Sequence, residues 1–333
     1  MELLFADVLG KPLWSWLGFL VLVSGLLVFD LGFLHRGSRE IGVRESLLLS
    51  AFYITVGVAF SLWIWQLMGQ QAALLYLTGF VIEKSLSMDN IFVMALIFTY
   101  FGIPRRYQHR VLVYGILGVV LLRGLMIGAG SAVVARFEWV LLLFAAFLIF
   151  TGIKMLMSSD EEYDVAANPV LGFMRRRFRV TDSLVGERFF VRRPDPTSGR
   201  PALFMTPLFL ALVMIELADV IFAVDSIPAI FAITTDPYII YTSNIFAILG
   251  LRALFFALSA ILHRFVHLEK ALSLVLVFIG GKVIAAEVLG IEKVPPALSL
   301  GVTAVILVGG VVLSLWSTRE RGAKPPIPGI ESE

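Results

Sequence analysis

The stretch Glu216-Leu-Ala-Asp-Val-Ile-Phe-Ala-Val-Asp-Ser-Ile-Pro228 decides how the rest of the chain is interpreted. It places three carboxylates, Glu216, Asp219 and Asp225, inside a run that is otherwise apolar from residue 203 to residue 232. An ionisable group at membrane depth is costly, so it usually faces a partner, an ion or water. The stretch therefore predicts a polar site inside a membrane.

A second stretch upstream, Glu83-Lys-Ser-Leu-Ser-Met-Asp-Asn-Ile-Phe-Val93, has the same pattern of polar residues. The matched pairs are Asp89 with Asp225, Glu83 with Asp219, and Asn90 with Ser226. In both stretches an acid is followed after five residues by Asp, then by Asn or Ser, then by Ile. We interpret the two stretches as the walls of one cation site.

The composition is that of a membrane protein. Of the 333 residues 59% are hydrophobic and 16% are charged, and the mean hydropathy is +0.90. Soluble domains average about 45–50% apolar and about 25% charged residues. The chain has no cysteine, which excludes disulfides, thiolate ligands and cysteine nucleophiles. We expect an all-α, polytopic helix bundle with no enzymatic activity, no nucleic-acid partner, no permanently bound cofactor and no N-terminal signal peptide.

Apolar runs of about 20 residues are long enough to cross a bilayer. Nine such runs are present: 13–34, 46–68, 72–101, 111–135, 138–157, 203–232, 239–262, 270–290 and 297–317. The predicted organisation is two leading helices (13–68), a first three-helix unit (72–157), a cytoplasmic loop (158–202), a second unit (203–290), a final helix (297–317) and a tail (318–333).

The distribution of positive charge orients these spans. If alternate loops and the C-terminal tail lie on one side, that side holds 19 of the 27 Lys and Arg, and the other side holds three. Cytoplasmic loops carry the excess of Lys and Arg. The bias predicts an outside N-terminus and an inside C-terminus, and it alternates correctly through all nine spans.

Further landmarks recur in the same order after each acidic stretch. The first set is Leu122-Arg123, Arg136-Phe137, Gly152 and Lys154, and the second is Leu251-Arg252, Arg264-Phe265, Gly280 and Lys282. Shared apolar residues could arise by chance, but matched charges in matched order favour a true repeat. Because each unit has three spans, adjacent copies would cross the membrane in opposite senses. Such inverted repeats place a substrate site near the bilayer midplane.

The spacing of the acids sets their geometry. Asp219 and Asp225 are six residues apart, which leaves them about 120° apart on a straight helix. Unwinding between them would bring them closer, and Pro228 suggests it, because a proline has no N–H to offer the carbonyl of Val224. Carboxylate, Asn, Ser and carbonyl oxygens suit hard cations such as Mg²⁺, Ca²⁺ and Mn²⁺.

A plainer alternative stays open at this point. The acids could simply pair with bases inside the bundle and hold no ion. The candidate bases are Arg123, Arg252, Lys154, Lys282 and Lys84. Asp30 is a sixth acid within the spans; it could line an ion path or lie at the cytoplasmic interface.

The two acidic stretches, the Asp30-Leu-Gly-Phe-Leu-His-Arg36 segment and Gly-Gly-Lys282 resemble the signature segments of the TerC/Alx family of bacterial integral membrane proteins. The family was named for tellurite resistance, several members are linked to manganese export, and it is grouped with LysE-type transporters. The resemblance implies a bacterial inner-membrane location. It also implies a metal site made by Glu83, Asp89, Asn90, Glu216, Asp219, Asp225 and Ser226.

The leading hypothesis is a secondary transporter that exports a divalent cation, with Mn²⁺ ahead of Ca²⁺ and Mg²⁺. The first alternative is a tellurium-resistance or redox-modulating membrane protein with no metal flux of its own. The second is a scaffold that binds a metal-delivery partner or a folding factor. A homo-oligomer is compatible with each of these hypotheses.

Overall fold

The computed structural model describes residues 2–33, 42–157, 165–194, 200–258, 267–288 and 294–322. Long α-helices dominate this part of the chain, which confirms the all-α prediction. The helices are α1 (Leu13–Phe33), α2 (Val43–Met68), α3 (Gln70–Tyr100), α4 (Arg105–Arg136), α5 (Val140–Met157), α6 (Pro169–Arg177), α7 (Pro207–Phe231), α8 (Pro237–Ile248), α9 (Leu251–Leu258), α10 (Leu268–Val288) and α11 (Pro296–Gly322).

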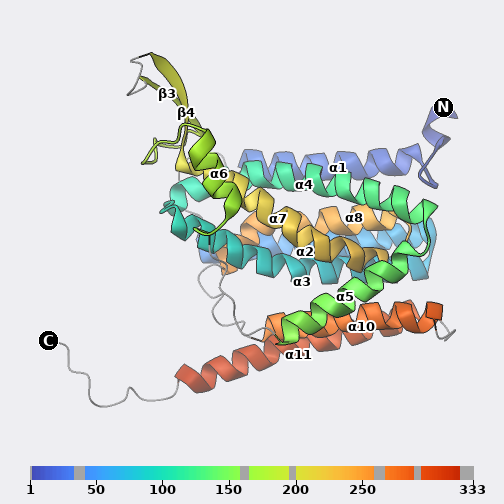
Figure 1. The fold of residues 1–333 in the computed structure, drawn as a ribbon. Helices are drawn as coiled ribbons and strands as arrows, with labels where there is room; N and C mark the ends of the chain where they lie inside the picture. The colour runs from blue at the N-terminus through green and yellow to red at the C-terminus, as the bar shows by residue number, and fades with distance from the viewer. Residues whose placement is uncertain are drawn as a thin grey trace.

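Eight helical spans in the described residues are long and apolar enough to cross a membrane, with α8 and α9 together forming one of them. The protein is therefore a multi-pass integral membrane helix bundle. The predicted third span, α3, is not one of the eight, because the charged residues Glu83, Lys84 and Asp89 lie within it. It still runs through the bundle beside the other long helices (Figure 1), so the described spans together with α3 match the nine predicted.

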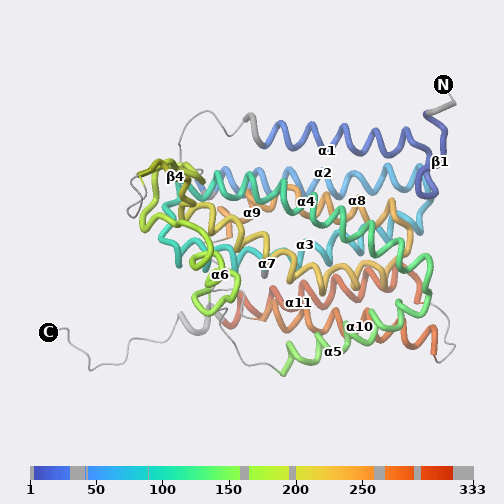
Figure 2. The backbone as a smooth tube through the Cα atoms, turned by 45° about the horizontal axis from the view of Figure 1, so that its top comes forward, coloured from blue at the N-terminus to red at the C-terminus, as the bar shows by residue number. Residues whose placement is uncertain are grey.

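The long helices lie nearly parallel, and α5, α10 and α11 form a group along one side of the bundle (Figures 1 and 2). Leu121, Leu125, Val305 and Trp316 are among the many large apolar side chains that are exposed on the outside. A soluble protein rarely exposes so much contiguous apolar surface. The outer surface is therefore suited to contact with lipid.

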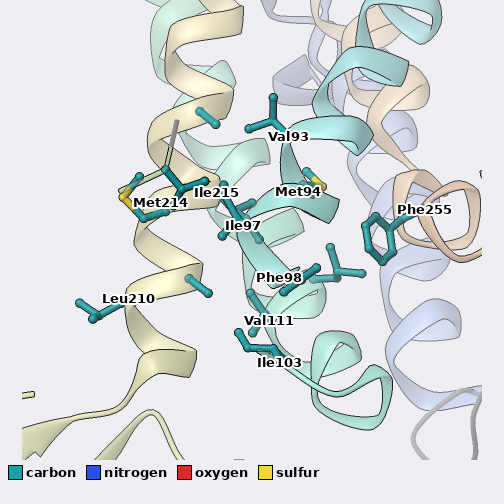
Figure 3. Close-up of a cluster of buried hydrophobic side chains, with 14 of the residues drawn as sticks. Val93, Met94, Ile97, Phe98, Ile103, Val111, Leu210, Met214, Ile215 and Phe255 are labelled. Atoms are coloured by element: carbon teal, nitrogen blue, oxygen red, sulfur yellow. The ribbon is translucent and has the colours of Figure 1, made fainter. Parts of the chain in front are cut away.

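An apolar core fills the part of the bundle nearest to the β3–β4 strand pair described below. Figure 3 shows Ile215 of α7 beside Ile97 of α3, and Phe98 of α3 toward Phe255 of α9, whose rings are 5.4 Å apart; Met94 and Met214 belong to the same cluster. All of these side chains are buried. This packing fixes α3 against α7, the two helices that carry the acidic stretches.

Helices α5 and α10 are packed closely through two glycines. A Cβ atom on Gly152 would lie 2.7 Å from the Ser273 carbonyl oxygen, and one on Gly280 would lie 2.5 Å from the Ala145 carbonyl oxygen. Gly152 therefore contacts Ser273, seven residues before Gly280, and Gly280 contacts Ala145, seven residues before Gly152. Gly152 and Gly280 are counterparts in the predicted repeat, and a two-fold relation between the two units would produce this reciprocal contact.

The break in a long helix is not where the sequence predicted it. Helix α7 continues through Pro228 to Phe231 without unwinding. Pro228 lies in the last turn, where the loss of one N–H does not redirect the chain. The break falls instead between α8 and α9, at Gly250, whose φ of +79° favours glycine. A Cβ atom there would lie 2.6 Å from Tyr53 Cβ.

The predicted loop 158–202 contains structure of its own. Besides α6, strand β3 (Phe190–Pro194) pairs in antiparallel fashion with β4 (Pro201–Met205). Residues 203–205 are therefore strand and not the start of the sixth span. Thr206 joins β4 directly to α7, and its backbone N–H donates to the Phe189 carbonyl oxygen (2.9 Å). Residues 158–164 and 195–199 lie outside the described part.

A second, shorter strand pair lies near the N-terminus, where η1 (Glu2–Phe5) is followed by β1 (Asp7–Val8) and β2 (Lys11–Pro12). It lies at the end of the bundle opposite to β3 and β4 (Figure 1). The carboxyl end of α11 lies at the β3–β4 end, and α11 extends to Gly322, into the predicted tail. The N-terminal strand pair and the carboxyl end of α11 thus lie at opposite ends of the bundle, and the side of the membrane that each end faces stays a prediction.

Candidate charged site in the helix bundle

A single arginine of α4 joins the two acidic stretches. The Arg123 side chain is 1% exposed, and its Nη1 atom donates to the Glu83 carboxylate of α3. Its Nε and Nη2 atoms donate to Asp219 Oδ2 and Oδ1 of α7, at 3.2 and 3.0 Å. Two predicted site acids therefore share one guanidinium.

Neutral polar side chains surround this ion triad. Arg123 Nη1 lies 3.1 Å from Ser226 Oγ and 3.4 Å from Asn244 Oδ1 of α8. Asn90 Nδ2 donates to Asp219 Oδ1 at 3.1 Å. All of these side chains are buried. Helices α3, α4, α7 and α8 thus contribute to one polar cluster inside the bundle.

Glu216 lies one helical turn before Asp219 on the same face of α7. Both Glu216 carboxylate oxygens are buried, and neither has a hydrogen-bond partner among the described residues. The carboxylate lies against Gly118 of α4, where a Cβ atom would be 2.4 Å from each oxygen. Asn90 Oδ1 is also buried, and the described part of the chain offers it no hydrogen-bond partner. Buried polar atoms without partners call for an explanation, such as a bound ion, water or proton.

The charges of the cluster do not balance when all groups are ionised. Glu83, Asp219 and Glu216 supply three negative charges, and Arg123 supplies one positive charge. Lys84 is directed elsewhere, because its Nζ donates to the carbonyl oxygens of Ala247 (2.8 Å) and Leu249 (3.3 Å). The excess of negative charge in a low-dielectric interior favours the uptake of a cation or of protons.

The structure directs one other predicted site acid, Asp225, to a different helix. Asp225 Oδ1 accepts a hydrogen bond from Thr151 Oγ1 of α5 at 3.3 Å. It faces away from Arg123 because α7 is unbroken, so the 120° separation expected on a straight helix is retained. For Asp89, the structure describes its place in α3 but not its side chain.

Asp30 belongs to a second polar cluster. Arg252 Nη2 of α9 donates to Asp30 Oδ1 (2.7 Å) and to the Asp30 carbonyl oxygen (2.9 Å). Arg252 Nη1 lies 2.7 Å from His109 Nε2. Since arginine has no acceptor, this ring nitrogen accepts the hydrogen bond. Arg252 and Asp30 are both buried.

The side chains that the structure describes include no group of three or more His, Asp and Glu placed to hold a metal ion. The carboxylates of Glu83 and Asp219 are instead directed at Arg123. Their oxygens are of the type that hard divalent cations prefer. Binding such a cation would require these acids to turn from Arg123 toward the ion.

Sequence reasoning missed the central place of Arg123 and the capping of α8 by Lys84. Arg123 was singled out only as a landmark of the repeat and as a possible counter-charge. The signal available in the sequence was its position in a long apolar run, where a charged residue usually faces a partner. Asn244 of α8 also lies at the edge of the cluster.

The fold and the buried cluster define a multi-pass integral membrane protein with a charged site inside its helix bundle. The chain belongs to the TerC family of integral membrane proteins, whose family model matches residues 68–322. A protein of Escherichia coli K12 named "Putative membrane-bound redox modulator Alx" is 42% identical over 319 residues, which cover 93% of this chain and 96% of that protein.

Two further relatives also match at least 90% of this chain. A Salmonella typhi protein with the same name is 42% identical over 327 residues, covering 96% of this chain and 98% of that protein. A Rickettsia bellii protein named "Uncharacterized membrane protein" is 44% identical over 301 residues, covering 90% and 97%. No solved structure matches the chain. The relation to LysE-type transporters stays a prediction.

Proposed function

We propose that the protein is a secondary transporter that exports a divalent metal cation across the bacterial inner membrane, with Mn²⁺ as the preferred ion. The observation that carries the proposal is the Glu216 carboxylate. Its oxygens are buried, have no hydrogen-bond partner among the described side chains, and lie on the same helix as Asp219, which Arg123 binds. A protein that used its acids only to brace the bundle would gain nothing from this third carboxylate, because burying an unpaired charge is costly.

In this proposal Arg123 substitutes for the metal when no metal is bound. Its positive charge keeps Glu83 and Asp219 together in the interior. An arriving cation would displace the guanidinium and bind to oxygens of Glu83, Asp219, Glu216 and Asn90. Mn²⁺, Mg²⁺ and Ca²⁺ all accept such ligands, and the family resemblance favours Mn²⁺. Protons taken up by the same carboxylates from the outer side would release the metal there.

The names of the relatives support a second candidate, a membrane-bound redox modulator that moves no metal. The chain has no cysteine, so thiol–disulfide exchange cannot take place on its own side chains. A redox effect could also follow indirectly from a change in cellular manganese. A scaffold for a metal-delivery partner remains the third candidate.

Metal flux in proteoliposomes separates these candidates. Purified protein is reconstituted around a Mn²⁺-quenched fluorophore, and the rate of quenching is measured with Mg²⁺, Ca²⁺ or Zn²⁺ as competitors. We expect Mn²⁺-dependent quenching that falls about tenfold or more in Asp219→Asn and Glu216→Gln, a loss typical of removing a metal-site group. Asp225→Asn is the matched control, because it removes an acid of the same helix that faces α5.

The outcomes are distinct. Wild-type protein that carries no divalent cation would rule out the transporter and favour the other two candidates. Wild-type flux that persists in Asp219→Asn and Glu216→Gln would keep the transporter but place its ion path elsewhere. A larger loss in Asp225→Asn than in Asp219→Asn would move the site toward α5.

A further inference from the structure

The two arginines that correspond in the predicted repeat have different partners. Arg123 binds Glu83 and Asp219, whereas Arg252 binds Asp30 and His109. In a two-fold arrangement Glu83 corresponds to Asp219, and Arg252 corresponds to Arg123. Arg252 would therefore bind Glu83 in the way that Arg123 binds Asp219. The reciprocal contact of Gly152 and Gly280 has the form that this arrangement requires. The pairing of Arg252 therefore departs from the symmetry that the glycine contact follows.

This departure from two-fold symmetry occurs at the break between α8 and α9. The corresponding helix of the first unit, α4, is continuous from Arg105 to Arg136. At the break, Lys84 holds the carbonyl oxygens of Ala247 and Leu249 at the end of α8. Gly250 then turns the chain with its positive φ, and Arg252 follows in the first turn of α9. The break thus positions Arg252 to reach Asp30 of α1.

A small cavity lies next to Arg252. Arg252 lines one part of it, and Gly115 of α4 lines another. A Cβ atom on Gly115 would be 3.6 Å from Glu216 Oε1, so this part of the cavity wall lies near the Glu216 carboxylate. Met94, Leu112 and Ile215 supply apolar walls. Arg252 belongs to α9, which lies toward the β3–β4 end of the bundle (Figure 2), the end that the charge bias predicts to be cytoplasmic.

We propose that Arg252 is a gating residue with two alternative sets of partners. In the conformation described here it binds Asp30 and His109 and closes the cavity. In a second conformation it leaves them and turns toward Glu83, as Arg123 is turned toward Asp219. Movement between the two positions would open a path from the cytoplasmic end to Glu216. The gate rests on the proposed transport function, since only a transported ion requires the path.

A charge swap distinguishes a gate from a fixed ion pair. Asp30→Asn and Arg252→Gln should each lower the thermal unfolding temperature. The double variant Asp30→Arg/Arg252→Asp should regain most of that temperature, because opposite charges again face each other. Its Mn²⁺ flux should stay about fivefold or more below wild type, since Asp at position 252 cannot bind Glu83. Full recovery of both stability and flux would overturn the proposal.

A second measurement needs neither metal flux nor the double variant. Because the chain has no cysteine, a single Leu112→Cys reports access to the cavity through its rate of maleimide labelling. The control is Val113→Cys, which is also buried on α4 but does not line the cavity. Asp30→Asn should speed labelling at position 112 by about fivefold or more, the size of a modest conformational coupling. The rate at position 113 should change little.

These rates decide the question even if the wild-type protein carries no metal. Equal acceleration at positions 112 and 113 would indicate general loosening of the bundle, and no acceleration at either would show that the Asp30 pair does not close the cavity. Either result overturns the gate and leaves the proposed transport to be judged by its own assay.

Discussion

Arg123 binds Asp219 through two of its nitrogens, with Nε 3.2 Å from Oδ2 and Nη2 3.0 Å from Oδ1, in the interior of the helix bundle. The same guanidinium also binds Glu83. This two-point contact between α4 and α7, together with the contact to α3, makes Arg123 the residue on which the acidic cluster depends. A lysine cannot reproduce it, because an ammonium group lacks the planar fork of donors.

Arg123→Gln should therefore be strongly destabilising. The substitution leaves two buried carboxylates without their counter-charge, a change that costs about 3–5 kcal/mol when one partner of a buried ion pair is removed. Arg123→Lys should lose less. Thermal unfolding in detergent measures both, with Arg136→Gln at the end of the same helix as the control. Equal unfolding temperatures for Arg123→Gln and Arg136→Gln would contradict the central role of Arg123.

Gly118→Ala should reduce transport without touching any charged residue. The added methyl group would lie 2.4 Å from both Glu216 oxygens, so the carboxylate must move. Gly124→Ala on the same helix is the matched control, because its Cβ atom would meet Tyr241 only at 4.0 Å. We expect the flux of Gly118→Ala to fall toward that of Glu216→Gln and the flux of Gly124→Ala to stay near wild type. Similar flux in the two alanine variants would show that the position of Glu216 does not matter.

The contact between α5 and α10 should be sensitive to one added methyl group on either side. Gly152→Ala and Gly280→Ala each place a Cβ atom within 2.7 Å of a backbone carbonyl oxygen, which cannot move aside as a flexible side chain could. Overpacking of this kind costs about 1–3 kcal/mol. Gly281→Ala is the control, since its Cβ atom meets nothing within 4 Å. Apparent unfolding temperatures should fall by similar amounts in the first two variants only.

The predicted topology places the N-terminus outside and α6 inside the cell. Phe5 and Arg176 are both exposed, at opposite ends of the bundle. A maleimide that cannot cross membranes should label Phe5→Cys on intact spheroplasts, and it should label Arg176→Cys only after permeabilisation. The reverse pattern would invert the proposed direction of transport together with the assignment of the gate to the cytoplasmic side.

The sequence predicted those features that are determined by local chemistry. The lengths of the apolar runs predicted the helices. The pattern of charged residues identified Glu83 and Asp219 as site residues, and the structure brings both to Arg123. It could not predict which base would join them, because Arg123 is 96 residues from Asp219 along the chain. That contact depends on how α4 packs against α7, which itself packs against α3.

The position of the helix break was also beyond local reasoning. A proline is a strong local signal, yet Pro228 lies too near the end of α7 to matter. Gly250 carries a weak signal, and its role depends on Tyr53 of α2 and Lys84 of α3, which are remote in sequence. The separation of Asp225 from Asp219 followed from simple helix geometry once α7 proved to be unbroken.

The direct junction of β4 and α7 has a practical consequence. Only Thr206 separates the strand from the helix that carries Glu216 and Asp219, and Thr206 is itself tied to the Arg188 and Phe189 carbonyl oxygens. An antibody fragment that binds the β3–β4 pair would thus be rigidly connected to the first turn of α7. Such a fragment would add mass for electron microscopy and, by holding α7 still, would trap the protein in a single conformation.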